Sequence, residues 1–257
     1  MRILNRTLQW SIISLGILFF TLPIYAASIF AFESKDGTFT LNPLRNASAN
    51  EQIMNSLDLT MRIAFGTVAV TLLLLVPTVA YLHLVTPGAR AWVEFLTLTP
   101  LVIPPIVQGI GFLYSMPISL KATPYSLIFA YTILAIPFSY RAIDAAFSSI
   151  DIQTMFDAAR SLGASHLAII FRIVIPNILS GIFGAIFLIV ALVLGEFAYA
   201  SLLLWDTFPT VLAVAGLSDA STAVALSVLS LVGVWLILGG LSIFNRNKRE
   251  LMRSGIG

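Results

Sequence analysis

The chain has 257 residues, of which 58% are hydrophobic and only 10% are charged, and its formal net charge is +2. Soluble domains usually carry about 25% charged residues, whereas apolar runs of about 18 or more residues, long enough to cross a bilayer, recur here. This composition excludes an ordinary soluble domain, and the absence of cysteine excludes disulfides and thiolate metal sites. We expect an all-α polytopic membrane protein that forms a single domain over residues 1–257. We expect no metal site and no nucleic-acid-binding surface.

Six transmembrane helices are predicted. They cover about residues 8–32, 57–85, 95–116, 125–147, 177–205 and 223–244. The first one imitates a secretory signal peptide with a cleavage site near Ser28, but its apolar stretch continues to Phe32. Because that stretch is longer than a signal-peptide core, we expect it to be retained as a span.

The distribution of Lys and Arg predicts the orientation of the spans, because cytoplasmic loops carry an excess of both. One side holds Arg2, Arg6, Arg90, Arg141, Arg160, Arg172, Arg246, Lys248, Arg249 and Arg253, and the other holds Lys35, Arg45, Arg62 and Lys121. We therefore expect both termini, and the loop 149–176 between the fourth and fifth spans, to lie in the cytoplasm.

The third span contains Pro104 and Pro105, followed by Gln108 and two glycines. Two prolines remove two backbone donors and should kink the helix, and freed carbonyls at bilayer depth must be satisfied by protein or water. The kink indicates either a bent, pore-lining helix or a bend that only serves packing.

Near the cytoplasmic end of the fourth span, Arg141 and Asp144 stand three residues apart. Side chains at this spacing meet on a helix surface, so we predict a local ion pair between them.

The loop 149–176 is predicted to form two helices with a tight turn between them. Ile152, Met155, Phe156 and Ala159 share one face of the first, and Leu167, Ile170, Phe171 and Val174 share one face of the second. Asp151 and Ser165 are candidate N-caps, and Gly163 is the expected left-handed stop. Such a segment either docks on a partner in water or lies on the lipid surface.

The fifth span carries Glu196 and Tyr199 in the sequence Gly-Glu-Phe-Ala-Tyr. Ionisable groups at bilayer depth are costly and usually face an interior or a cavity. If the protein moves a solute across the membrane, both residues are candidates for the translocation path or its gate. The alternative is a carboxyl group that is hydrogen-bonded to a neighbouring helix and is purely structural.

The loop resembles the EAA loop of permease subunits of binding-protein-dependent ABC importers. That family carries Glu-Ala-Ala, three residues, Gly, and about a dozen residues later a hydrophobic residue followed by Pro. The corresponding residues here are Asp157, Ala158, Ala159 and Gly163, then Phe171, and then the pair Ile175-Pro176. The departure is Asp157, which stands where the family has Glu and keeps the charge.

This resemblance implies a coupling helix that docks into a groove of a separate cytoplasmic ATPase. The implied assembly has two ATP-binding cassette subunits holding ATP and Mg, a second permease that we expect to be a different chain, and an extracytoplasmic solute-binding protein. It would lie in the bacterial inner membrane. The chain has no Gly-x-x-x-x-Gly-Lys-Ser/Thr phosphate loop, so we expect it to bind no cofactor and to be no enzyme.

The predicted solute is a polyamine such as spermidine or putrescine. The Pro104-Pro105 pattern is similar to that of polyamine-type permeases, and Glu196 in an apolar path would favour a cation. Aminophosphonate, ferric iron and thiamine are the alternatives within the family. Outside it, the alternative is an ion-coupled secondary transporter, although the internal repeat typical of such folds is not evident.

Overall fold

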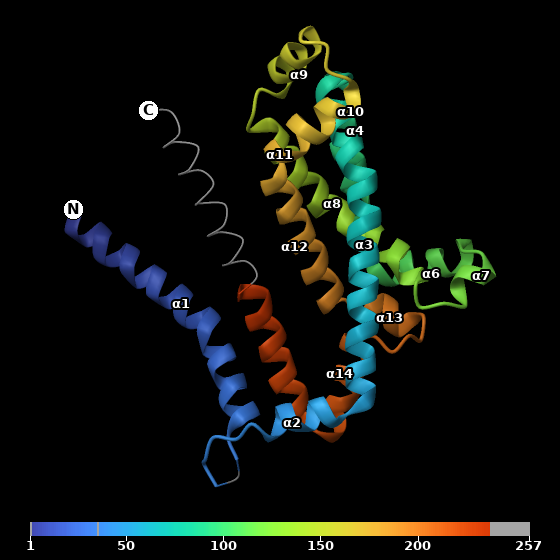
Figure 1. The fold of residues 1–257 in the computed structure, drawn as a ribbon. Helices are drawn as coiled ribbons and strands as arrows, with labels where there is room; N and C mark the ends of the chain where they lie inside the picture. The colour runs from blue at the N-terminus through green and yellow to red at the C-terminus, as the bar shows by residue number, and fades with distance from the viewer. Residues whose placement is uncertain (1, 35, 237–257) are drawn as a thin grey trace. The chain divides into compact units, whose positions relative to one another are not determined.

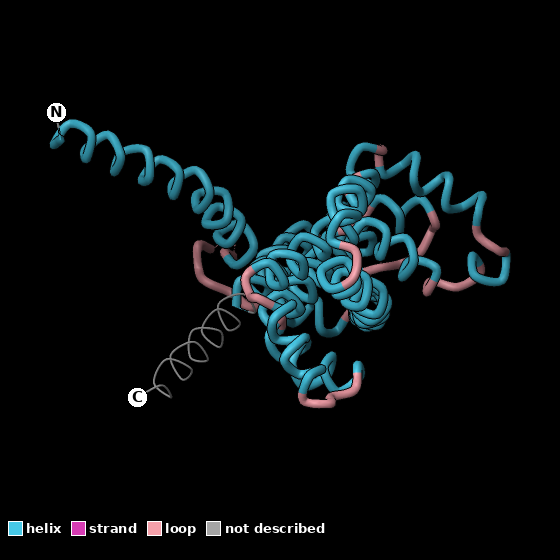
Figure 2. Tube along the Cα trace, turned by 90° about the horizontal axis from the view of Figure 1, so that it is seen from above, coloured by secondary structure: helices cyan, strands magenta, loops and turns pink. Residues whose placement is uncertain are grey.

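The computed structural model describes residues 2–34 and 36–236, where regular structure is helical apart from one bridge between Glu33 and Phe39 (Figure 1, Figure 2). The helices are α1 (Arg2–Phe32), α2 (Asn42–Ala49), α3 (Glu51–Leu84), η1 (Pro87–Ala89), α4 (Arg90–Thr97), α5 (Thr99–Val102), α6 (Pro105–Ser115), α7 (Ile118–Lys121), α8 (Ser126–Ser148), α9 (Ile152–Ser161), α10 (His166–Ile169), η2 (Ile170–Val174), α11 (Ile175–Asn177), α12 (Leu179–Gly195), α13 (Ala198–Leu202), α14 (Phe208–Ser218) and a last helix, Ala220–Leu236. The predicted all-helical architecture is confirmed over this part of the chain.

Three of the described helical stretches are long and apolar enough to cross a membrane: Leu8–Phe32, α3 and α8. They correspond to the first, second and fourth predicted spans. Counting two bent helix pairs as one span each raises the number to five in the described residues. The last helix begins at Ala220, but residues 237–244 of the predicted sixth span lie outside the described residues. The six-span count therefore stays a prediction.

The third predicted span is broken at its two prolines, and the fifth is shorter than the sequence predicts. Pro87–Val102 and Pro105–Ser115 meet at an angle of 99°, and Ile170–Asn177 and Leu179–Gly195 meet at 65°. The fifth predicted span also ends at Gly195 rather than near Trp205. Apolar residues continue on both sides of Glu196, which is why the hydrophobicity of the sequence did not reveal the earlier end of the fifth span.

The chain divides into two compact units, and each is described by itself. One contains the residues up to Asn55 together with Val211–Trp235, and the other contains Ser56–Thr210. The prediction of a single domain over 1–257 stays a prediction.

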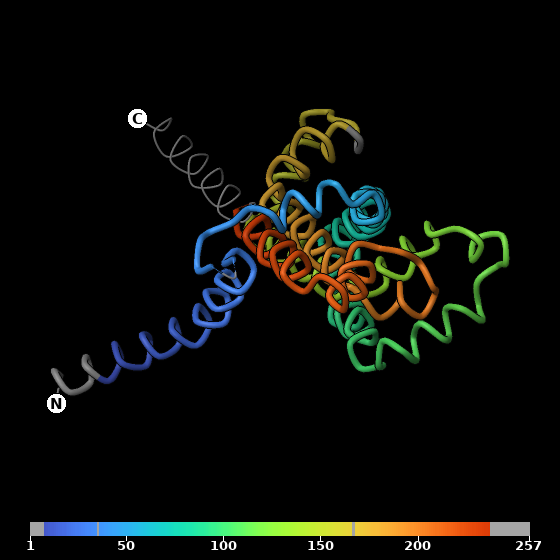
Figure 3. The backbone as a smooth tube through the Cα atoms, turned by 90° about the horizontal axis from the view of Figure 1, so that it is seen from below, coloured from blue at the N-terminus to red at the C-terminus, as the bar shows by residue number. Residues whose placement is uncertain are grey.

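In the Ser56–Thr210 unit, α8 and α12 lie side by side (Figure 1, Figure 3). Small residues permit this close approach, as is usual between helices in membranes. A Cβ atom at Gly181 would lie 2.5 Å from the Ala146 Cβ and 2.7 Å from the Ala142 carbonyl oxygen. The two helices thus touch backbone to backbone at Gly181.

A hydrophobic core at one end of this helix pair joins the spans to the loop between them. It includes Val79 of α3, Ile143 and Phe147 of α8, and Ile152 and Ala159 of α9. All five are buried. The first helix of the predicted loop is therefore packed onto the ends of the spans.

In the other unit, Asp219 begins the last helix as its N-cap. Its carboxylate accepts hydrogen bonds from the Thr222 backbone N–H at 3.1 Å and the Thr222 hydroxyl at 2.5 Å. Both hydrogen bonds lower the pKa of this carboxyl group from its ordinary value, and the one from the Thr222 hydroxyl has the larger effect. The chain thus enters the last helix through a satisfied cap.

Candidate functional site

The first candidate site is α9, where the predicted cap is confirmed. The Asp151 carboxylate accepts a hydrogen bond from the Thr154 backbone N–H at 3.3 Å and another from the Thr154 hydroxyl at 2.7 Å. Both hydrogen bonds lower the pKa of the Asp151 carboxyl group, and the one from the Thr154 hydroxyl has the larger effect. Asp151 therefore stays ionised beside the helix N-terminus, which favours negative charge.

The predicted stop at Gly163 is also confirmed. Gly163 has φ +81°. The Ala164 N–H bonds the Ala159 carbonyl at 3.0 Å, and the Gly163 N–H bonds the Arg160 carbonyl at 2.9 Å. This pair of bonds defines a Schellman motif, which requires a left-handed residue at the glycine position.

The predicted inner face of α9 is confirmed at three of its four positions. Ile152 and Ala159 are buried and Phe156 is half-buried in the same core, whereas Met155 is exposed. Asp157 and Ala158, two residues of the candidate motif, face outward. The Gln153 amide donates to the Asp157 carboxylate at 3.3 Å, across one turn of that outer face.

The second helix of the loop begins as predicted but continues differently. The Ser165 hydroxyl accepts a hydrogen bond from the Ala168 N–H at 3.3 Å, which confirms the cap. Beyond α10 the chain widens into the π-helix η2. Because a π turn displaces the following residues around the axis, Ile169 and Val174 are the buried positions and Phe171 is 65% exposed. The prediction that Phe171 and Val174 share a face was wrong.

Pro176 lies in α11, the last short helix before α12, and the 65° bend follows directly. The Asn177 side-chain amide donates to the Ile173 carbonyl at 2.8 Å. Pro176 therefore marks the end of the loop, as the sequence predicts.

The second candidate site begins at the break between α5 and α6. Ile103 and Pro104 are extended, with ψ of 127° and 137°, and Pro105 starts α6, so the predicted kink is confirmed as a complete break. The Gln108 side-chain amide donates to the Pro100 carbonyl at 2.5 Å and to the Ile103 carbonyl at 2.7 Å. Gln108 thereby satisfies carbonyl groups that the break leaves without helical partners.

Glu196 lies at the corresponding break between α12 and α13. Its backbone is extended, with ψ 115°. One carboxylate oxygen accepts from the Ala198 N–H at 2.9 Å and from the Tyr199 N–H at 3.1 Å. The predicted mid-helix carboxyl group is therefore a cap at the N-terminus of α13. Hydrogen bonds from backbone N–H groups stabilise its negative charge.

Tyr199 connects the two breaks. Its hydroxyl donates a hydrogen bond to the Gln108 side-chain oxygen at 3.0 Å. A cavity of about 520 Å³ lies beside this contact, lined by Thr99, Pro100, Ile103, Gln108, Phe112, Ser115, Met116, Pro117, Ile133 and Tyr199. The structure thus brings Gln108, Tyr199 and Glu196 into one group, with Pro104 and Pro105 at its edge.

Comparison with known proteins decides what kind of chain this is. A family model described as the binding-protein-dependent transport system inner membrane component matches residues 87–249, more than half of the chain. The chain belongs to this family. The matched region includes the Asp157–Pro176 loop and both helix breaks. The predicted permease family is thus confirmed, and the coupling role of the loop stays a prediction.

Two further similarities accompany the family match. The chain is 28% identical over 232 residues to a probable molybdenum ABC transporter permease protein of Haloferax volcanii, covering 85% of this chain and 82% of the relative. A crystal structure of an amino acid ABC transporter with histidines matches with a TM-score of 0.57 at 18% identity. It covers 81% of this chain and 100% of that one. The latter similarity shows a common fold.

This permease is a multi-pass inner-membrane component of an ABC importer and a transport subunit rather than an enzyme. Family membership implies an ATPase and a second permease as its partners. Neither matched protein is described as a polyamine transporter, so the comparisons lend the predicted substrate no support.

Sequence reasoning missed a partly buried ionic cluster on the permease, centred on Asp144. The Arg90 guanidinium donates to both carboxylate oxygens, at 2.8 and 2.6 Å, and His83 Nε2 lies 2.9 Å from one of them. The His83 ring also stacks on Phe147, with centroids 5.1 Å apart. Asp144 therefore joins α3, α4 and α8, three helices that no local spacing rule relates to one another.

The predicted ion pair between Arg141 and Asp144 is not formed. Arg141 instead lies 3.7 Å from the Glu94 carboxylate, in an exposed pair. Helical spacing permits an Arg141–Asp144 contact, but a bidentate arginine from another helix binds the carboxylate more strongly. The missed signal was Arg90, a basic residue close to the start of the third predicted span.

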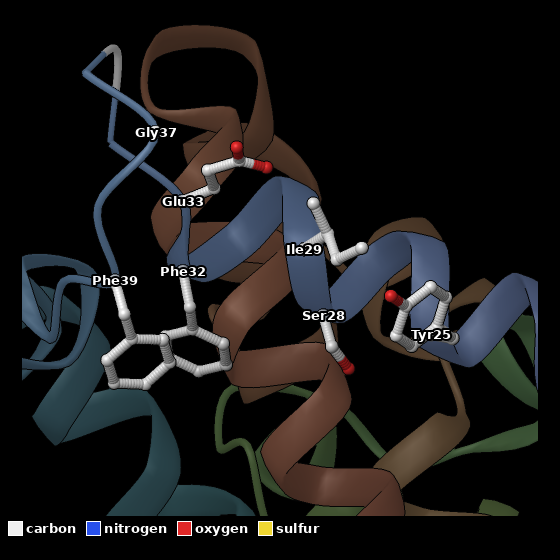
Figure 4. A pocket seen from close by; sticks show the side chains of 7 residues that line it. All are labelled: Tyr25, Ser28, Ile29, Phe32, Glu33, Gly37 and Phe39. Atoms are coloured by element: carbon white, nitrogen blue, oxygen red, sulfur yellow. The ribbon is translucent and has the colours of Figure 1, made fainter.

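A second cavity, of about 320 Å³, lies at the end of α1 and in the loop that follows (Figure 4). It is lined by Tyr25, Ser28, Ile29, Phe32, Glu33, Gly37 and Phe39. The Phe32 and Phe39 rings pack against each other with centroids 5.7 Å apart, and the Glu33 carboxylate points away from them (Figure 4). This cavity shares no lining residue with the one beside Tyr199.

Proposed function

We propose that this permease forms half of the translocation path of a binding-protein-dependent importer and is driven through α9 by a cytoplasmic ATPase. The termini and the loop 149–176 would face the cytoplasm. ATP and Mg would be held by two partner ATPase subunits, a solute-binding protein would deliver solute from outside, and the second permease would be a different chain. The observation that carries the proposal is the construction of α9: an inner face fixed in the core and an outer face left open.

The outer surface of this loop has the chemistry of a docking site. Leu162 is 88% exposed beside Gly163, and Phe171 is 65% exposed. Both side chains would bury apolar surface if a partner covered the loop. Asp157 and Ala158 lie on the same open side of α9, where the small alanine lets a partner approach closely. We therefore favour a protein groove over the lipid surface as the binding partner of this loop.

Replacing Gly163 by valine should uncouple transport. A left-handed conformation costs a non-glycine residue about 1–2 kcal/mol, equivalent to about a tenfold loss of the correctly turned loop, and more for a β-branched side chain. We expect solute uptake by reconstituted importer to fall by about that factor or more, and less ATPase to co-purify. Labelling of the loops would verify that the spans are still inserted.

Gly163→Asn is the matched control, because asparagine tolerates the left-handed region better than other residues with a side chain. A Cβ atom at this position meets nothing within 4 Å, so the two variants differ in backbone strain and not in steric clash. Normal uptake by the valine variant would show that the turn is not needed for coupling.

For the solute, we propose a molybdenum oxyanion in place of the polyamine predicted from the sequence. The similar permease of Haloferax volcanii is described as a probable molybdenum transporter. The cavity beside Tyr199 offers neutral polar groups, those of Gln108, Ser115 and Tyr199, and such a lining does not repel an anion. The Glu196 carboxylate, which was to attract a cation, is already bonded to the N-terminus of α13.

Uptake of molybdate and of putrescine by vesicles containing the importer separates the two solutes. With Glu196→Gln we expect molybdate uptake to be retained, since a glutamine oxygen still accepts from α13 and one weakened hydrogen bond changes an equilibrium by only about tenfold or less. Putrescine uptake should stay at background in both forms. Putrescine uptake that requires the Glu196 charge would restore the polyamine prediction.

A further inference from the structure

We propose that the hydrogen bond between Tyr199 and Gln108, here called the latch, holds α6 against α13 in a closed state and must open for solute to pass. The proposal rests on the proposed function and adds to it a device that controls the path. It starts from a continuous chain of contacts. Glu196 caps α13, Tyr199 of α13 donates to Gln108, and Gln108 donates to the carbonyls of Pro100 and Ile103.

This chain of contacts joins the two places where the spans are broken. At the first break, Pro104 and Pro105 lack backbone donors, and the Gln108 amide bonds the free carbonyls instead. At the second break, the Glu196 carboxylate bonds the free N–H groups of α13. Each break is thus stabilised by a side chain, and the latch is the bond between the two stabilised ends.

The geometry on either side of the latch suits a movable segment. α6 is connected to α5 by two extended residues at a 99° bend. α13 has only five residues, and so short a helix depends on its cap and its packing for stability. Tyr199 and Ala200 of α13 are buried, whereas α6 buries only Gly109. Because regions held by few contacts open at the lowest free-energy cost, α6 is the part that would move. In Figure 1, α6 and α7 extend away from the α8–α12 pair, with α13 nearby.

The latch also closes a wall of the cavity. Gln108 and Tyr199 both line it, together with residues from each side of the first break, Pro100 and Phe112. Packing reinforces the bond, because a Cβ atom at Gly109 would lie only 2.6 Å from Leu202 Cδ2 and 3.7 Å from the Tyr199 ring. Separating α6 from α13 would break the hydrogen bond and open the cavity along that seam.

A reversible cross-link tests whether α6 and α13 must separate. The chain contains no cysteine, so a Gly109→Cys, Leu202→Cys pair provides the only thiols of this chain. The Leu202 change removes the atom that a Cβ at position 109 would meet, and it leaves the latch residues intact. We expect oxidation to reduce molybdate uptake and ATP-driven turnover of the full importer to background, and a reductant to restore both.

The control is a second cysteine pair, Phe32→Cys with Phe39→Cys, at two positions whose rings pack against each other with centroids 5.7 Å apart. Its oxidation should leave uptake unchanged. Continued uptake after complete cross-linking of the 109–202 pair would overturn the latch. If the wild-type permease co-purifies with no ATPase and the preparation hydrolyses no ATP, the proposed function itself is refuted.

Tyr199→Phe tests the bond without a cross-link, because it removes the hydroxyl and keeps the ring. Loss of one hydrogen bond should weaken the closed state by about two- to tenfold. We therefore expect ATP hydrolysis in the absence of the solute-binding protein to rise by a similar factor. An unchanged basal rate in a correctly folded variant would show that the hydrogen bond does not hold the closed state.

Discussion

Gly181→Val is expected to destabilise the permease by about 1–3 kcal/mol, the usual cost of forcing extra atoms into a packed core. The cost should lie at the upper end, because the new Cβ would meet the Ala142 carbonyl oxygen at 2.7 Å as well as the Ala146 Cβ at 2.5 Å. A backbone carbonyl cannot rotate away as a long side chain can. The helices α8 and α12 must separate instead, and every contact along their interface weakens.

Thermal unfolding in mild detergent measures this effect, and Gly184→Ala is its control on the same helix. A Cβ atom at Gly184 would lie 3.7 Å from the Ala142 Cβ, which is ordinary contact. Since alanine favours a helix over glycine by about 1 kcal/mol, the control should be neutral or slightly stabilising. Equal melting temperatures for the two variants would contradict backbone contact at Gly181.

Asp144→Asn should have the second large effect, because it removes the charge on which the ionic cluster depends. Breaking a buried pair by removing one partner costs about 3–5 kcal/mol. Asp144 is only 14% exposed, but the Arg90 side chain is 35% exposed, and water can solvate part of the released guanidinium. We therefore expect a loss near the lower end of that range, with α4 detached from α8.

The matched control for Asp144→Asn is Arg141→Gln, one turn away on α8. The Arg141–Glu94 pair spans 3.7 Å with side chains that are 66% and 43% exposed, and exposed pairs contribute about 0–1 kcal/mol. The control should hardly change the melting temperature in detergent. If both variants melt alike, the Asp144 cluster does not join the helices as described.

Local features of this permease were predictable from sequence because each has a local cause. Asp151 and Ser165 cap helices by bonding residues three positions away, and Gly163 alone fits the left-handed end of α9. The break at Pro104 follows from missing donors. None of these required knowledge of which helices are neighbours.

Other features depend on contacts between distant residues and could not be predicted in this way. The partners of Asp144 come from positions 54 and 61 residues earlier in the chain. Phe171 is exposed because η2 widens the helix, and nothing in the pattern of apolar residues marks a π turn. Glu196 lies in an apolar run that reads as one helix, although its carboxylate caps a new helix there.

The short connection between α8 and α9 has a mechanical consequence. α8 ends at Ser148 and α9 begins at Ile152, and the intervening backbone still bonds to α8 through Ser149 and Ile150. So short a connector cannot stretch or store elastic energy, and the shared core adds stiffness to it. A displacement of α9 would therefore also move the ends of the spans to which it is joined.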